Sequence, residues 1–217
     1  MVFRSPGTSR QFRGIQRIAL HHDLTYVLRM TVPFVERARV QWTYEDLRLM
    51  PDDGQRYEVI DGDLLVTPAP TTTHQTLSKR IQFALMQQIE LRGLGQVFNA
   101  PVDLIFSRLR TVQPDLLVVR TERTNFITER GIETAPDLVV EILSPSTEQT
   151  DRERKAKLYA SEGVREYWIV DAAQRCIEIY GLAESGYDLL GKYGPGTQVS
   201  SRVFELELSV DAVFASR

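Results

Sequence analysis

Two short apolar segments stand out along the chain, and each begins with Pro-Asp. The first is Pro114-Asp115-Leu116-Leu117-Val118-Val119, and the second runs from Pro136 to Leu143 with Glu141 as its one interior charge. Continuous apolar runs of this length, bounded by turn residues, are typical of strands that are covered on both faces. Alternation places Val139, Glu141 and Leu143 on one face of the second strand, so the sequence predicts a glutamate inside the core.

Glu141 therefore needs a compensating partner. An ionised carboxylate in such a strand loses hydration worth several kcal/mol unless a cation or hydrogen-bond donors replace the water. Asp115 lies at the head of its strand and Glu141 near the tail of the other, so neighbouring strands can bring both acids to one sheet edge. Two carboxylates with water are the usual way to hold Mg²⁺. The alternatives are a protonated or arginine-paired Glu141 and a turn-capping Asp115.

The remaining pattern predicts one mixed α/β domain. An Asp-Gly pair at 61–62 between apolar runs indicates a β-hairpin, and apolar residues at every fourth position indicate a long helix from Thr71 to about Leu91. The other expected elements are a short helix opening at Thr43, strands near 96–106, 115–119, 165–171 and 175–180, and a helix near 151–162. This order favours a mixed central β-sheet flanked by helices.

The helix at 151–162 offers two lysines for the acidic site. A Mg²⁺ site of this kind often binds phosphate and can hydrolyse phosphodiesters. Such hydrolysis benefits from a cation beside the phosphorus under attack, because the cation stabilises the charge that develops in the transition state. Lys155 lies one turn before Tyr159 and can face the sheet, whereas Lys157 points about 200° away and should be solvated. For either lysine alone, an ordinary exposed helix charge is the alternative.

Composition narrows the function only slightly. The chain has 217 residues, 42% of them hydrophobic and 25% charged, with a net charge of −3 that indicates no particular partner. A single cysteine, Cys176, excludes an internal disulfide, and with three scattered histidines it argues against a zinc site. No apolar run approaches the length of a membrane span, so we expect a cytoplasmic protein. Residues 1–39 are arginine-rich and are expected to be a poorly ordered extension of a domain at 40–217, with a basic arm or targeting peptide as alternatives.

The chain closely resembles the Uma-type restriction endonuclease family of the PD-(D/E)XK nuclease superfamily. The resemblance runs from about Trp42 to the C-terminus and rests on "YEVIDGDLLVTPAPTTTHQ", "QPDLLVV", "APDLVVEILSPST" and "DRERKAKLYASEGVREYWIVD". It implies a restriction-endonuclease-like core that cuts DNA with Mg²⁺, with Mn²⁺ as a substitute. It also implies that Asp115 and Glu141 are the metal acids. The superfamily lysine usually stands two residues after the second acid, where this chain has Leu143, so the resemblance transfers that role to Lys155.

Three more residues follow from the resemblance alone. Glu58 matches a further acid that can bind metal or orient water, with an exposed hairpin charge as the alternative. His74 and Gln75 match a His-Gln pair at a helix start, where they would contact substrate phosphate or simply cap the helix.

Three classes of function stay open at this point. The first is a Mg²⁺-dependent DNA endonuclease, for which a homodimer would suit double-strand cutting. The second is a non-catalytic DNA-binding or mobile-element-associated module that keeps the nuclease fold. The third is a metal-dependent hydrolase of another substrate, or a protein–protein module. A channel lined by arginines would favour DNA, whereas acidic surroundings would favour the third class. The candidates for that channel are Arg120, Arg123, Arg152 and Arg154.

Overall fold

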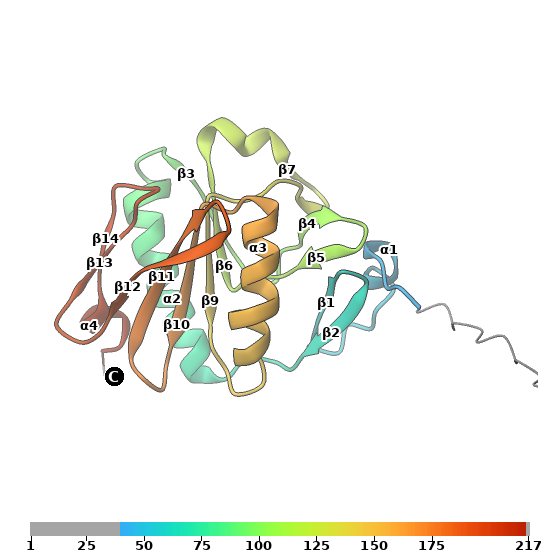
Figure 1. Ribbon diagram of the computed structural model, residues 1–217, viewed down its shortest axis with the longest axis horizontal. Helices are drawn as coiled ribbons and strands as arrows, with labels where there is room; N and C mark the ends of the chain where they lie inside the picture. The colour runs from blue at the N-terminus through green and yellow to red at the C-terminus, as the bar shows by residue number, and fades with distance from the viewer. Residues whose placement is uncertain (1–39, 216–217) are drawn as a thin grey trace, which may run out of the picture. The chain divides into compact units, whose positions relative to one another are not determined.

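The computed structural model describes residues 40–215, which form a mixed α/β unit built on two six-stranded sheets (Figure 1). The predicted fold class is confirmed. The expected extension at 1–39 lies outside the described residues. Within the described part of the chain, no helix is both long and apolar enough to cross a membrane.

The central sheet has the strand order β12-β11-β10-β9-β6-β3. Its strands are β3 (Gly95–Asn99), β6 (Leu116–Arg120), β9 (Leu138–Ile142), β10 (Glu166–Asp171), β11 (Cys176–Ala183) and β12 (Gly186–Tyr193). The strand β9 runs parallel to β10 and antiparallel to β6, and all five of its residues are buried. The two Pro-Asp segments are thus adjacent central strands, as their apolar pattern predicts.

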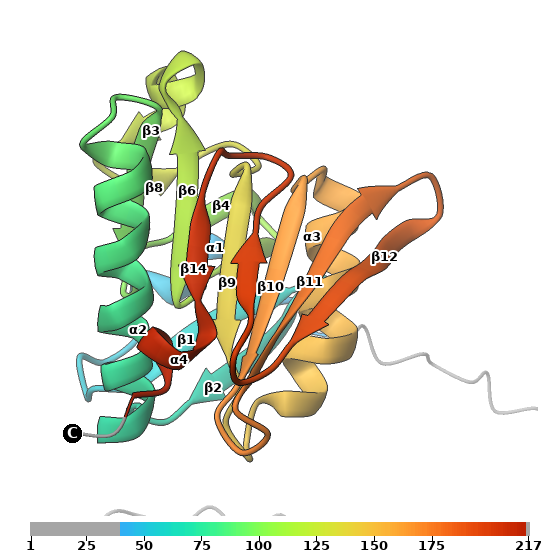
Figure 2. The same ribbon diagram turned by 90° about the vertical axis from the view of Figure 1, so that its left-hand side faces the viewer.

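One face of this sheet packs against the long helix and the C-terminal segment (Figure 2). The helix α2 (Thr72–Leu85) continues as a π-helical turn, η1 (Met86–Glu90), and its every-fourth-residue apolar stripe is buried. The C-terminal segment adds β13 (Gln198–Ser200), β14 (Glu207–Ser209) and α4 (Val210–Val213). The predicted helix at 71–91 is therefore confirmed to within one residue at each end.

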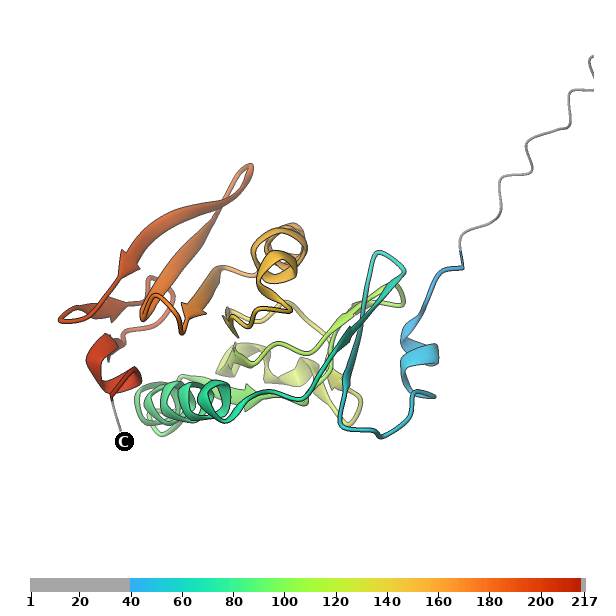
Figure 3. The same ribbon diagram turned by 90° about the horizontal axis from the view of Figure 1, so that it is seen from below.

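The other face packs against α3 (Ala156–Glu162) and the second sheet, so α2 and α3 lie on opposite sides of the central sheet (Figure 3). The helix α3 is preceded by a π-helical segment, η3 (Thr150–Lys155). The second sheet has the order β2-β1-β5-β4-β8-β7. Its strands are β1 (Arg56–Ile60), β2 (Asp63–Thr67), β4 (Leu104–Ser107), β5 (Arg110–Val112), β7 (Ile127–Thr128) and β8 (Gly131–Ile132). The short segments α1 (Tyr44–Leu47) and η2 (Thr121–Phe126) complete the described elements.

The second sheet is an addition to the expected helix-flanked sheet, and the sequence did not predict it. The stretch 96–106, expected as one strand, is two strands, β3 and β4, that belong to different sheets. Pro101 separates them, and a proline cannot donate to a strand ladder, so the chain leaves one sheet before it enters the other. The β1–β2 hairpin is as predicted: Asp61 and Gly62 both have positive φ, at 53° and 81°, as a tight turn with inverted backbone requires.

Candidate active site

Asp115 and Glu141 meet at one edge of the central sheet. Because β6 and β9 are antiparallel and Leu116 pairs with Val140, the residue before β6 lies beside the end of β9. The backbone N–H of Ile142 donates to Asp115 Oδ2 over 2.8 Å, which ties the aspartate to the residue next to Glu141. The predicted convergence of the two strand ends is therefore confirmed.

Asp115 is buried and held as an anion. Arg56 Nη1 donates to its Oδ1 over 2.8 Å, and His74 Nε2 donates to its Oδ2 over 2.9 Å. Burial alone would raise the pKa of Asp115, but the hydrogen bond from His74 and the charge of Arg56 outweigh it and lower the pKa to about 2. A carboxylate has about four acceptor positions, so these two bonds and the Ile142 bond leave about one for a further ligand.

Glu141 is buried too, but its surroundings act in the opposite direction. Its Oε1 accepts hydrogen bonds from Lys155 Nζ over 3.0 Å and from Tyr159 Oη over 2.7 Å. Burial, reinforced by the charges of neighbouring acids, chiefly Asp151, outweighs the attraction of Lys155 and raises the pKa of Glu141 to about 8. A cation bound beside Glu141 would favour its ionised form over the protonated one.

Lys155 lies inside the acidic group, with only 5% of its surface exposed. Its Nζ is 3.0 Å from Glu58 Oε1 and 3.0 Å from Glu141 Oε1. Burial disfavours the ammonium, yet the surrounding carboxylates outweigh that cost and raise the pKa of Lys155 well above its usual value. Lys157 is exposed. The helix register inferred from the sequence is confirmed, and the reading of Lys155 as an exposed charge is wrong.

The residues suggested only by the resemblance fall into two groups. Glu58 is buried and accepts a hydrogen bond from the backbone of Gln113 over 2.7 Å, so the exposed-charge alternative is wrong. His74 is also buried, and its ring holds Asp115 rather than capping its own helix; the cap is Thr71, which accepts from the His74 backbone. Gln75 is exposed and lines a neighbouring cavity, not the one that contains the acids.

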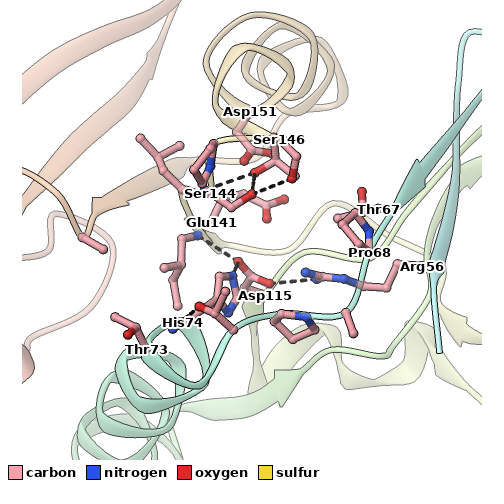
Figure 4. Close-up of a pocket in the computed structure, with 18 of the residues that line it drawn as sticks. Arg56, Thr67, Pro68, Thr73, His74, Asp115, Glu141, Ser144, Ser146 and Asp151 are labelled. Atoms are coloured by element: carbon pink, nitrogen blue, oxygen red, sulfur yellow. Dashed lines mark hydrogen bonds and ion pairs between the residues drawn. The ribbon is translucent and has the colours of Figure 1, made fainter.

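A cavity of about 320 Å³ opens above these groups, between the β1–β2 hairpin, the start of α2 and the loop that follows β9. In Figure 4, Arg56 reaches Asp115 from the hairpin side, and Asp151, Ser144 and Ser146 lie across the cavity. Its rim is rich in hydroxyl groups, from Thr67, Thr71, Thr73, Ser144, Ser146 and Thr147. The cavity therefore combines a charged floor with a neutral rim of hydroxyl and apolar groups.

The floor suits a divalent cation in charge and in donor type. Four carboxylates line the cavity against two permanent cations, Arg56 and Lys155. The carboxylates are Glu58, Asp115, Glu141 and Asp151. Asp151 is 2% exposed, and its Oδ1 has no hydrogen-bond partner, so one buried acceptor is unsatisfied. Among residues 40–215 no three potential ligands already converge on a point, so an ion here would complete its shell with water or substrate, as Mg²⁺ commonly does.

The four arginines considered as a DNA channel lie elsewhere. None of them lines this cavity. Arg120 and Arg123 lie near Asp137, Arg152 binds Glu178, and Arg154 binds Asp63. These candidate arginines therefore do not form a channel at this cavity, and acids elsewhere in the fold lie close to each of them.

Sequence reasoning missed three residues of the site. Asp151 is one helical turn from Lys155, and Tyr159 is one turn beyond it, so the face that carries Lys155 carries both. Arg56 is two residues from Glu58 on the same strand, and both line the cavity. The periodicity needed to find all three was present once Lys155 and Glu58 were chosen.

The family model described as "Putative restriction endonuclease", Uma2, matches residues 44–212. This chain belongs to that family. A curated relative, "Uncharacterized protein slr1290" of Synechocystis sp. (strain PCC 6803), is 26% identical over 166 residues, which are 74% of this chain and 84% of the relative. A crystal structure described as a putative nuclease belonging to DUF820, from Anabaena variabilis, superposes with a TM-score of 0.67. It is 20% identical and the match covers 80% of this chain and 97% of that one, which shows a shared fold.

Proposed function

We propose that this Uma2-family protein is a Mg²⁺-dependent DNA endonuclease that hydrolyses phosphodiester bonds, with Mn²⁺ as a substitute. The observation that carries the proposal is the buried ammonium of Lys155, 3.0 Å from Glu141 and from Glu58, beside an ionised Asp115. Family membership makes nuclease chemistry the first expectation. We further propose that the protein acts in the cytoplasm, and that two copies would cooperate where both strands are cut.

In this proposal Asp115 and Glu141 hold the metal. Mg²⁺ bound there would polarise the phosphodiester and lower the pKa of an attacking water. Arg56 and His74 fix the orientation of Asp115 through both of its oxygens, so that the ligand is preorganised. Lys155 supplies positive charge near the scissile phosphate, and Glu58 keeps that ammonium in position.

The rim of the cavity would bind the DNA backbone. Threonine and serine hydroxyls donate well to phosphate oxygens, and Thr73, which lines the cavity, lies in the first turn of α2, where backbone N–H groups have no partner within the helix. Gln75 is exposed on the same helix and can extend this contact beyond the cavity. His74 would act through Asp115 and not by touching the substrate.

The test is nicking of supercoiled plasmid by the full chain with Mg²⁺, with Mn²⁺ and with EDTA. We expect metal-dependent nicking that is lost in Glu141→Gln and in Lys155→Ala. The matched control is Lys157→Ala, which changes an exposed lysine on the same helix and should cut like wild type. Equal loss in both lysine variants would contradict the assignment of Lys155.

One observation favours a second candidate, a metal-dependent phosphodiesterase that acts on a substrate other than DNA. Acids and hydroxyls form most of the polar lining of the cavity, and its two basic side chains, Arg56 and Lys155, are both paired with acids. Hydrolysis of a small aryl phosphodiester without plasmid nicking would support this candidate. DNA binding without cleavage in any metal would instead indicate a non-catalytic module.

A further inference from the structure

The ammonium of Lys155 stands among three carboxylates but meets them unequally. Its Nζ is 3.0 Å from Glu58 Oε1 and from Glu141 Oε1, and 3.6 Å from Asp151 Oδ1. An ammonium has three N–H donors, enough for all three acids. At 3.6 Å the third contact is an ion pair and not a hydrogen bond. One favourable contact is thus available and unmade.

Asp151 has a buried, unsatisfied acceptor close to the Lys155 ammonium. Its side chain is 2% exposed, and Oδ1 is buried without a hydrogen-bond partner. Its backbone is fixed at both polar atoms: the N–H donates to Thr147 O over 2.8 Å, and the carbonyl accepts from Tyr167 Oη over 3.1 Å. Because the main chain is held, closing the 3.6 Å gap requires movement of the Lys155 or Asp151 side chain, not of the helix.

A divalent cation on Glu141 would change the balance around Lys155. The same oxygen, Glu141 Oε1, now accepts the ammonium, so a metal ion on that carboxylate would place two cations against each other. In a buried site such repulsion is poorly screened. The ammonium needs another anion within reach, and Asp151 is that anion.

We propose that Lys155 exchanges one partner when the metal binds: it leaves Glu141 for Asp151, which then holds the ammonium in its working position together with Glu58. This inference rests on the proposed function. In the metal-free site Lys155 acts as the resident counter-cation of Glu58 and Glu141. Asp151 is a positioning residue that acts through Lys155 and does not touch metal or substrate.

A double-mutant cycle on metal affinity tests the exchange without any DNA. Mn²⁺ binding is measured by calorimetry for wild type, Asp151→Asn, Lys155→Met and the double variant, with folding checked by circular dichroism. We expect Asp151→Asn to weaken binding by about 10-fold, the effect seen when an outer-shell partner is lost. Lys155→Met should bind more tightly than wild type, and adding Asp151→Asn to it should change nothing further. The control is Glu153→Gln, an exposed acid on the same helix, which should bind like wild type.

An equal loss from Asp151→Asn in both backgrounds would overturn the proposal, because Asp151 would then be a metal ligand or a plain source of negative field. If Lys155→Met does not fold, a crystal structure of wild type with Mn²⁺ decides instead. Nζ should lie about 2.9 Å from Asp151 Oδ1. An ammonium that stays on Glu141, or Asp151 in the metal shell, would reject the exchange.

The outcomes also separate this inference from the proposed function. A wild-type protein that binds no metal overturns both. Suppose that the protein binds metal and cuts DNA, but that the effects of the Asp151 and Lys155 substitutions on Mn²⁺ affinity are additive. That result overturns the partner exchange and leaves the proposed function standing. A cycle as expected in a protein that never cuts DNA supports the exchange and overturns the endonuclease assignment.

Discussion

The same dipeptide, Pro-Asp, begins two adjacent strands and has opposite surroundings at its two positions. Because β6 and β9 are antiparallel, Asp115 and Asp137 lie at opposite ends of the strand pair. Each carboxylate accepts a backbone N–H from the other strand, Asp115 from Ile142 over 2.8 Å and Asp137 from Arg120 over 2.9 Å. Locally the two aspartates do the same thing: they cap the end of the strand ladder.

Their neighbours differ in charge. Asp137 is fully buried, and its Oδ1 is 3.9 Å from Arg120, 3.6 Å from Arg123 and 3.7 Å from Arg165, so three cations share one anion. Around Asp115 the carboxylates outnumber the permanent cations four to two. A local motif therefore specifies a capped strand, and the charges brought in by other elements decide whether acids or cations are in excess at that end.

The largest expected effect is on cleavage. Asp115→Asn keeps the cap on Ile142 but removes the anion, and we expect nicking to fall by at least about 100-fold, the scale of losing one electrostatic contact to the transition state. Asp137→Asn makes the same chemical change at the other end of the strand pair and should cut within a few-fold of wild type. Plasmid nicking rates under identical Mg²⁺ concentrations give the comparison. Similar losses in both variants would mean that the two ends are not functionally distinct.

The sequence could predict the part of this contrast that depends on local pattern. The apolar runs predicted the two central strands. Because one acid lies at the head of its strand and the other near the tail of the next, the sequence also predicted that Asp115 and Glu141 meet. Helical spacing separated the buried Lys155 from the exposed Lys157, since only one of them shares a face with Tyr159. These inferences need only the period of a strand or a helix, which is fixed by backbone geometry.

The sequence could not predict the long-range pairings. Arg56 reaches Asp115 across 59 positions, and Arg120 lies near Asp137 because two strands run in opposite directions. The second sheet was missed for the same reason: its short strands, such as β5 and β8, gain their burial from partners distant in the chain. Charge pattern alone therefore could not decide whether the four candidate arginines lie at the site, and the fold keeps them elsewhere.

Metal binding should raise the stability of the folded protein through the Asp115 end of the β6–β9 strand pair and not through the Asp137 end. A ligand that binds only the folded state at 100 times its dissociation constant adds about 2.7 kcal/mol to the free energy of unfolding. For a domain of this size that corresponds to a Tm increase of roughly 5–10 °C. We expect this increase with Mg²⁺ for wild type and Asp137→Asn, and little or none for Asp115→Asn and Glu141→Gln. Thermal unfolding followed by circular dichroism, with and without EDTA, measures it.

The Asp137 end should contribute to the free energy of unfolding even when no metal is present. Asp137→Asn leaves three arginines around a neutral amide, and loss of one partner from a buried ion cluster typically costs 3–5 kcal/mol. Because the arginines are partly exposed, water screens them, and we expect a loss of about 2 kcal/mol in the free energy of unfolding. Urea unfolding in EDTA gives this value. A variant as stable as wild type would show that the cluster is neutral in energy.

The smallest effects distinguish the arginines within that cluster. The Arg165 side chain is 59% exposed and approaches Asp137 through one ion pair, so Arg165→Gln should change the free energy of unfolding by less than about 0.5 kcal/mol. The Arg123 side chain is 29% exposed and also donates to Thr134 Oγ1 over 2.6 Å, so Arg123→Gln removes an ion pair and a hydrogen bond together. We expect it to cost about 1 kcal/mol more than Arg165→Gln, the usual net worth of one hydrogen bond. The same urea experiment resolves the two, and a larger loss from Arg165→Gln would mean that the exposed arginine, not the sheltered one, neutralises Asp137.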